Sequence, residues 1–146
     1  MRHHPFISMN ARCFCQGTEM RQKVEMAMKF IVGEDADIAE ETAEGYHGNK
    51  LTIMTTQTTK KGNMRPLADI IYENRDRLKE ELDDRLDEER VFHLRLSKQD
   101  AFNQKITIVQ GAKEGGVVDI SLKVESYPAS REKGMNNLKT WLDLVD

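Results

Sequence analysis

Cationic side chains are the residues of this sequence whose type and spacing suit a chemical role. The stretches RLSKQ (95–99) and KVESYPASREKG (123–134) each place basic residues beside an expected strand end, and KKGN (60–63) adds two lysines. Phosphate recognition needs several cations on one face, because each neutralised phosphate releases counterions. We therefore expect a phosphate-binding surface formed by Arg12, Lys60, Lys61, Arg95, Lys98, Gln99, Lys123, Arg131 and Lys133. The simpler interpretation, ordinary solvated charge, stays open.

A second motif, EGYHGN at residues 44–49, offers two rings for stacking. Tyr46 and His47 would lie at a loop tip, where a ring can stack on an unpaired base of single-stranded RNA. The glycines and Asn49 have a simpler explanation, since a tight reversal needs residues that tolerate a positive φ. The motif predicts a turn and leaves a ligand role for the two rings open.

These residues must be positioned by strands and helices, which the hydrophobic periodicity predicts. In chain order the patterns indicate the strand 7–17, the helix 18–32, the strands 37–43 and 50–59, a helix from Asn63 to about Leu86, the strands 91–99, 105–109 and 117–127, and a terminal helix. The glycines between residues 43 and 50 make the second and third strands a hairpin.

The element order βαββαβββα predicts one α+β domain over residues 1–146, with a mixed, mostly antiparallel sheet and helices packed on one face. The other face of such a sheet stays in contact with water. Lys123 falls on the polar side of its strand, and Arg12, His93 and Arg95 project from the same open face if the strands pair as expected.

The charge of the chain is unevenly distributed. Residues 73–90 hold nine acidic and five basic residues, a local charge of −4, whereas the whole chain carries −3, which leaves +1 for the rest. One acidic helix therefore hides a mildly basic remainder, and binding depends on the local potential more than on the total. The same helix could instead dock on a basic protein partner.

Metal and catalytic sites are not indicated. Cys13 and Cys15 lie two residues apart in an expected strand, where a disulfide would have poor geometry, so free packed thiols are expected. Structural zinc takes four ligands with recognisable spacing, and Cys13, Cys15 and His93 lack it. Glu19, Glu44 and Glu125 are scattered, so neither a two-metal nuclease site nor any cofactor is expected.

The ends and the apolar content of the chain bear on its location. No apolar run approaches the ~20 residues that span a bilayer, and the first ten residues lack the apolar stretch of a secretory signal. A cytoplasmic protein is therefore expected, with residues 1–5 loose and no membrane partner.

Several segments resemble an archaeal family of predicted RNA-binding proteins, also described as predicted exosome subunits. They are RCFCQGTE (12–19), EGYHGN (44–49), LRLSKQDAF (94–102) and KVESYPASRE (123–132), and they cover nearly the whole chain in order. The matching residues are Arg12, Thr18, Glu19, Glu44, Gly45, Gly48, Asn49, Arg95, Lys98, Gln99, Tyr127, Pro128 and Arg131. Ser97 departs from the pattern, because many relatives have an acid before the Lys-Gln pair.

The resemblance implies a fold similar to that of the large-subunit ribosomal protein that binds 5S ribosomal RNA. It also implies RNA, ribosomal or otherwise structured, as a partner, with exosome or ribosomal proteins as further partners, and no defined reaction. The expected function is non-catalytic RNA binding in RNA processing or ribosome metabolism. The competing hypothesis is a protein-interaction module that uses the acidic helix 73–90, and an enzyme ranks third.

Overall fold

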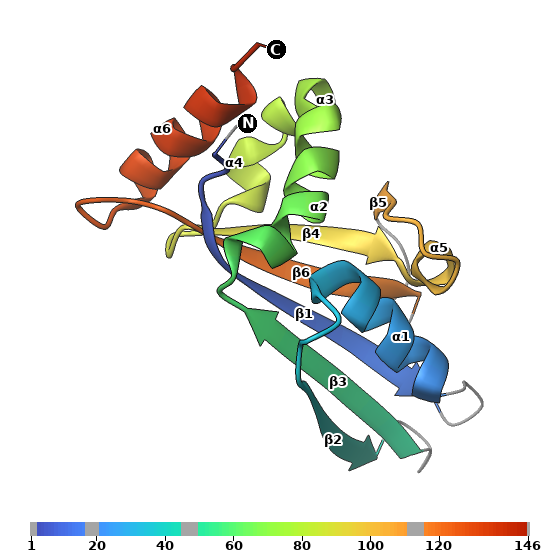
Figure 1. Ribbon diagram of the computed structural model, residues 1–146. Coiled ribbons are helices and arrows are strands. Elements are labelled where there is room, and N and C mark those ends of the chain that lie inside the picture. Colours follow the sequence, from blue (N-terminus) through green and yellow to red (C-terminus); the bar gives the residue numbers. More distant parts are fainter. Residues whose placement is uncertain (1–2, 17–20, 45–49, 111–115, 146) are drawn as a thin grey trace. The chain divides into compact units, whose positions relative to one another are not determined.

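The computed structural model describes residues 3–16, 21–44, 50–110 and 116–145. Within these ranges the chain forms strands and helices in the arrangement of an α+β protein, as the sequence predicts (Figure 1). In chain order they are β1 (Phe6–Gln16), α1 (Arg21–Val32), β2 (Ile38–Glu44), β3 (Lys50–Thr58), α2 (Lys61–Glu73), α3 (Arg75–Lys79), α4 (Leu82–Arg85), β4 (Val91–Ser97), α5 (Lys98–Phe102), β5 (Ile108–Val109), β6 (Val117–Val124) and α6 (Arg131–Leu142).

The strands form one sheet in the order β2-β3-β1-β6-β4-β5 (Figure 1). Strands β2 and β3 run antiparallel with Ile38 opposite Thr56, which confirms the predicted pairing of these two strands. Strands β4 and β5 are also antiparallel, with Leu96 opposite Ile108. The turn between β2 and β3 lies outside the described residues.

The chain divides into two compact units. Unit 1 consists of Met1–Met9, Thr59–His93 and Ser121–Asp146, and unit 2 consists of Asn10–Thr58 and Leu94–Ile120. Three of the four boundaries fall within strands β1, β4 and β6, and the fourth follows the last residue of β3. Helices α2, α3, α4 and α6 therefore belong to unit 1, and helices α1 and α5 belong to unit 2.

In unit 2, helix α1 buries the stripe that the sequence pattern indicates. The helix contacts β3 and α5. Gly33 ends it with a φ of 125°, a left-handed conformation that glycine adopts without steric cost. The buried residues of the helix are Val24, Ala27, Met28, Ile31 and Val32.

The core of unit 1 contains a cluster of aromatic rings. Phe6 is fully buried, and its ring centroid lies 5.5 Å from that of Trp141 and 6.3 Å from that of Phe92. The ring of Tyr72 lies 5.8 Å from Trp141, and its hydroxyl donates to the Leu144 carbonyl. Because these rings come from β1, α2, β4 and α6, their contacts join four elements of unit 1.

The helix expected from Asn63 to Leu86 is divided into three helices in the structure. Helix α2 ends at Glu73, and the side-chain amide of the C-cap residue Asn74 donates to the Ile70 carbonyl at 2.8 Å. An asparagine that bonds locally to the backbone competes with helix continuation. The acidic segment 73–90 is therefore not one helix, and that prediction is wrong.

The first helix of this region begins earlier than the sequence predicts. Helix α2 begins at Lys61, with Lys60 rather than Asn63 at the N-cap position. Leu78, Leu82 and Leu86 are nevertheless buried. Their spacing thus predicted correctly which residues are buried, but not that the backbone turns between them.

Strands β4 and β6 confirm the predicted separation into a buried and an open side. Along β4 the buried residues alternate with His93 and Arg95, which are exposed. Along β6 the buried residues alternate with Asp119, Ser121 and Lys123, which are half-buried. One side of each strand therefore packs in the core, and the other side carries polar groups toward solvent.

The chain near the N-terminus is better packed than the sequence suggests. His4 is only 1% exposed and Pro5 is also buried, so the prediction of a loose segment is wrong for both. The His4 ring accepts the Phe6 N–H at Nδ1, at 3.3 Å, and donates from Nε2 to the Lys61 carbonyl at 3.1 Å. These two bonds require the neutral ring with its proton on Nε2.

This environment predicts that acid destabilises unit 1 through His4. Burial lowers the pKa of His4 below 6.5, and the charges of Lys61 and Arg65 act in the same direction, although the bond to the Lys61 carbonyl opposes them. The unfolded chain therefore binds the proton more readily. The stabilisation is complete above pH 6.5 and is lost as the pH falls from 6.5 toward the lower native pKa.

Urea unfolding at pH 7.5, 6.5 and 5.5 measures this effect. Wild type and His3→Gln should lose stability equally on acidification, because His3 is exposed. His4→Gln keeps a donor and an acceptor but does not titrate, so its stability should change less over this range. If the His4→Gln protein lost as much stability on acidification as wild type, the acid sensitivity could not be attributed to His4.

Candidate nucleic-acid interface

Arg12 lies on the exposed side of β1 in unit 2. Its guanidinium carbon lies 4.8 Å from the centroid of the Phe14 ring, two residues along the same side of the strand. Such a cation–π contact orients the guanidinium without neutralising it. Among the described residues Arg12 has no carboxylate partner, so its charge is available to a phosphate.

Arg95 also lies on an exposed side in unit 2, but it is paired. Its Nε lies 3.2 Å from Oδ1 of Asp119 on β6. Both side chains are partly exposed, so the pair contributes little stability and a phosphate could compete for the arginine. Asp119 nevertheless reduces the positive potential here, and the sequence alone did not indicate this partner.

Lys98 does not lie on the exposed surface where the sequence placed it. The residue is only 5% exposed, and its Nζ donates to the Phe14 carbonyl at 2.7 Å. A buried ammonium requires such a partner. Lys98 is therefore a structural cation of unit 2, and it is not available as a surface phosphate contact in this conformation.

Gln99 is exposed in the short helix α5. The helix begins after Ser97, whose Oγ accepts the Asp100 N–H at 3.1 Å. Ser97 is the position where the sequence departs from the resembling family, and serine is a favoured N-cap residue. The departure thus has a local structural explanation.

The two lysines of KKGN differ in their environments. Lys60 is exposed at the start of α2. Lys61 is half-buried, and its Nζ donates to the His4 carbonyl at 2.9 Å. Burial lowers the pKa of this lysine, and the charge of Glu125 partly offsets the effect. Lys61 therefore fastens the N-terminal segment of unit 1.

Lys123 and Lys133 are the accessible cations of the KVESYPASREKG stretch. Lys123 is half-buried on the open side of β6, and Lys133 is exposed in the first turn of α6. Neither side chain has an ion-pair partner among the described residues. Both belong to unit 1, and both can bind phosphate without first losing a carboxylate.

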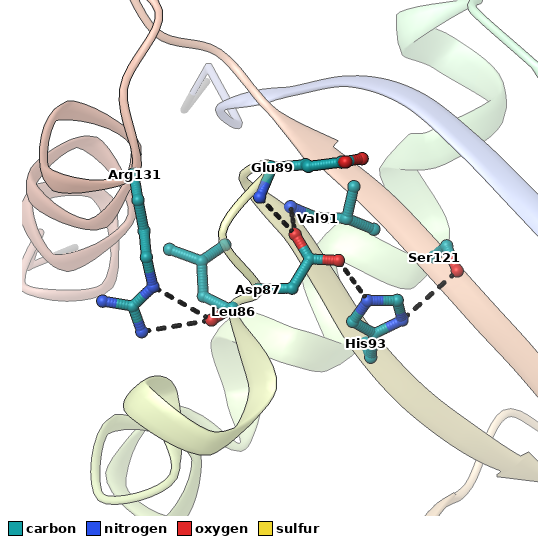
Figure 2. Close-up of polar contacts among 7 residues, drawn as sticks. All are labelled: Leu86, Asp87, Glu89, Val91, His93, Ser121 and Arg131. Carbon is teal, nitrogen blue, oxygen red and sulfur yellow. Dashed lines mark hydrogen bonds and ion pairs between the residues drawn. The ribbon is translucent and has the colours of Figure 1, made fainter.

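Arg131 from the same stretch has a structural role (Figure 2). Its Nε and Nη2 donate to the Leu86 carbonyl at 3.2 and 3.1 Å, and Nη2 also donates to the Asp83 carbonyl at 3.2 Å. These carbonyls lie at the end of α4, where helix carbonyls lack partners within the helix. Arg131 therefore joins the start of α6 to the end of α4.

His93 takes part in a polar cluster with Asp87 and Ser121 (Figure 2). Its Nε2 lies 2.8 Å from Asp87 Oδ2, and its Nδ1 lies 3.4 Å from the Ser121 hydroxyl. Burial of Asp87 opposes ionisation, but hydrogen bonds from His93 and from the Val91 and Glu89 N–H groups lower its pKa. The cluster thus fixes the turn that precedes β4.

Serine, histidine and aspartate also form the triads of hydrolases. A nucleophilic serine additionally needs N–H donors aimed at a developing oxyanion. Ser121 lies within β6, where backbone N–H groups serve the sheet. The geometry therefore favours a structural explanation for the three side chains.

The remaining candidates are a loop motif and a pair of thiols. Tyr46 and His47 lie outside the described residues. Cys13 and Cys15 are buried on β1 and form no disulfide bond. Within residues 3–16, 21–44, 50–110 and 116–145, no group of three or more His, Cys, Asp or Glu side chains is placed to hold a metal ion.

In the same part of the chain, no helix has the length and apolarity required to cross a membrane.

The acidic segment 73–90 uses several of its carboxylates within unit 1. Glu81 pairs with Arg85 at 3.0 Å, and Asp87 pairs with His93. Asp83 lies 3.6 Å from Arg131. The segment is therefore a folded part of unit 1 in which these three carboxylates have partners, which weakens the hypothesis of a single acidic docking helix.

Comparison with known proteins assigns the chain to a class. Residues 8–125 match a family described as RNA binding, and the chain belongs to this family. It is 24% identical, over 95% of both chains, to an RNA-binding protein of Pyrococcus abyssi. The resemblance to an archaeal RNA-binding family is thereby confirmed.

Solved structures agree with the fold. A DUF54 protein from Methanothermobacter thermautotrophicus is 31% identical, with a TM-score of 0.80 over 95% of this chain and 99% of that chain. A UPF0201 protein from Methanococcus jannaschii gives a TM-score of 0.63 over 95% of each chain at 13% identity, and so shows the shared fold alone.

Proposed function

We propose that this protein binds RNA in the cytoplasm without catalysing a reaction on it, as an exosome-associated component of RNA processing or as a factor in ribosome metabolism. The family match over residues 8–125 carries the proposal. The name of the Pyrococcus abyssi relative supports RNA as the ligand. The RNA is expected to be ribosomal or otherwise structured, with single-stranded segments accessible.

The distribution of charges supports the same ligand. Arg12, Lys123 and Lys133 have no carboxylate partner among the described residues, and each is accessible to solvent. Unpaired cations of this kind can bind a polyanion without first losing a carboxylate partner, and the counterions released from the phosphates favour the complex. Arg95 is expected to bind phosphate more weakly, because Asp119 competes for it. Lys98, Lys61 and Arg131 instead donate to backbone carbonyls within their own units.

A fluorescence-anisotropy titration tests the proposal. Labelled single-stranded RNA and a structured ribosomal RNA fragment are titrated with the protein between 50 and about 300 mM salt. We expect binding whose logarithmic affinity falls linearly with the logarithm of the salt concentration. No measurable binding at the lowest salt concentration would contradict RNA binding.

A separate cleavage assay tests whether the protein catalyses a reaction on RNA. The same RNAs, incubated with the protein and Mg²⁺ and then separated on a denaturing gel, should keep their full length. A cleavage activity that co-purifies with the wild-type protein and is lost in His93→Ala would instead show a reaction at the Asp87–His93–Ser121 cluster.

A further inference from the structure

Tyr127 is the most exposed large apolar side chain in the described part of the chain. It is 92% exposed, and no other Phe, Tyr or Trp among the described residues belongs to the exposed class. Ring surface of this size is normally buried, since burial of an aromatic side chain is strongly favourable. A ring exposed to this extent presents its face to solvent, where it is accessible to another molecule.

The backbone around Tyr127 is held by specific hydrogen bonds. The Ser126 hydroxyl donates to the Pro128 carbonyl at 2.7 Å and accepts the Ser130 N–H at 3.2 Å. The Asn137 side-chain amide donates to the Glu125 carbonyl at 2.6 Å. These bonds fix the residues on both sides of the tyrosine, so a ligand that stacks on the ring pays little to order the loop.

The loop occupies an accessible place in unit 1. Figure 1 shows the segment between β6 and α6 extending as an open loop, coloured orange to red. Because Tyr127 is 92% exposed, a planar ligand can reach its ring without displacing other side chains.

Cations lie on both sides of the ring along the chain. Lys123 precedes Tyr127 by four residues on β6, and Lys133 follows it by six residues in the first turn of α6. Glu125 and Glu132 are exposed between them and reduce the local charge. A ring bordered by charged residues suits a ligand that alternates planar groups with anionic ones, which is the pattern of single-stranded RNA.

We propose that Tyr127 is a stacking platform for an unpaired RNA base, with Lys123 and Lys133 binding the phosphates on either side of that base. This inference rests on the proposed function and specifies which form of RNA unit 1 recognises. A protein partner is less favoured, because protein hot spots are packed within apolar surroundings. Residues 123–133 instead contain five charged side chains.

The test compares two RNAs and three substitutions. A short single-stranded RNA with 2-aminopurine at one position reports stacking by a change in fluorescence, and a blunt duplex of the same sequence offers no unpaired base. Tyr127→Ala should bind the single strand roughly tenfold more weakly, from the value of one base–aromatic stack. Tyr127→Phe keeps the ring and should bind like wild type.

The duplex and a matched control separate this inference from the proposed function. All the proteins should bind the duplex equally, and Met26→Ala, which trims a 64%-exposed side chain on α1, should change neither affinity. If wild type binds no RNA, the proposed function itself fails. If wild type binds but Tyr127→Ala matches it on the single strand, the stacking platform is excluded, and the ring is left as a protein contact.

Discussion

Replacing Phe6 by alanine is expected to lower the free energy of unfolding by about 3–5 kcal/mol, the usual cost of deleting a buried aromatic ring. Phe6 is fully buried and contacts Trp141 and Phe92, so its removal leaves a cavity among rings that come from separate elements. The surrounding backbone belongs to β1, β4 and α6, which limits collapse into the cavity.

Urea unfolding followed by tryptophan fluorescence measures this loss, because Trp141 is the single tryptophan of the chain and lies beside the cavity. Ile7→Ala is the matched control on the adjacent residue. Ile7 is 40% exposed, so its truncation should cost well under half as much. Equal losses in the two variants would contradict the packing described for unit 1.

The second large effect is expected on RNA affinity. Arg12→Ala, Lys123→Ala and Lys133→Ala combined should weaken RNA binding by about 100-fold or more at low salt. Each lost phosphate contact should also reduce the salt slope by roughly one. The triple variant should remain folded, because these side chains are exposed or half-buried and have no ion-pair partner among the described residues.

A control variant with the same total charge shows whether position matters. Arg21, Lys29 and Lys79 pair with Glu40, Glu25 and Asp143 respectively, so Arg21→Ala, Lys29→Ala and Lys79→Ala remove three partnered cations. This control should lose much less affinity than the first variant. If both triple variants lost the same RNA affinity, binding would depend only on the net charge of the protein, and Arg12, Lys123 and Lys133 would not be specific RNA contacts.

The sequence predicted the elements well where periodicity and end signals agree. Strand β6 alternates as the pattern indicates, and α1 ends at Gly33, where the backbone adopts a positive φ. The pattern did not predict that the long helix is divided at Asn74. Leucines spaced four residues apart are buried both in one continuous helix and in successive short helices, so their spacing cannot distinguish the two.

The candidate residues of the interface lie in two different kinds of environment. Arg12 and Lys123 lie on open sides of their strands, as the alternation requires. Lys98 and Arg131 matched the family pattern equally well, yet both are structural, because each ends beside a backbone carbonyl from a distant part of the sequence. Residue type could not separate these two groups.

The sequence by itself determined the α+β class, the family and the solvent-facing sides of β4 and β6, because these depend on local periodicity and on motifs. Only the tertiary structure decided which charges are available. The pairing of Arg95 with Asp119 and the burial of Lys98 against the Phe14 carbonyl depend on contacts between residues far apart in the chain. The exposure of Tyr127 depends on how the loop after β6 is folded. The availability of a cation is set by the groups within about 4 Å of it, and folding alone brings those groups together.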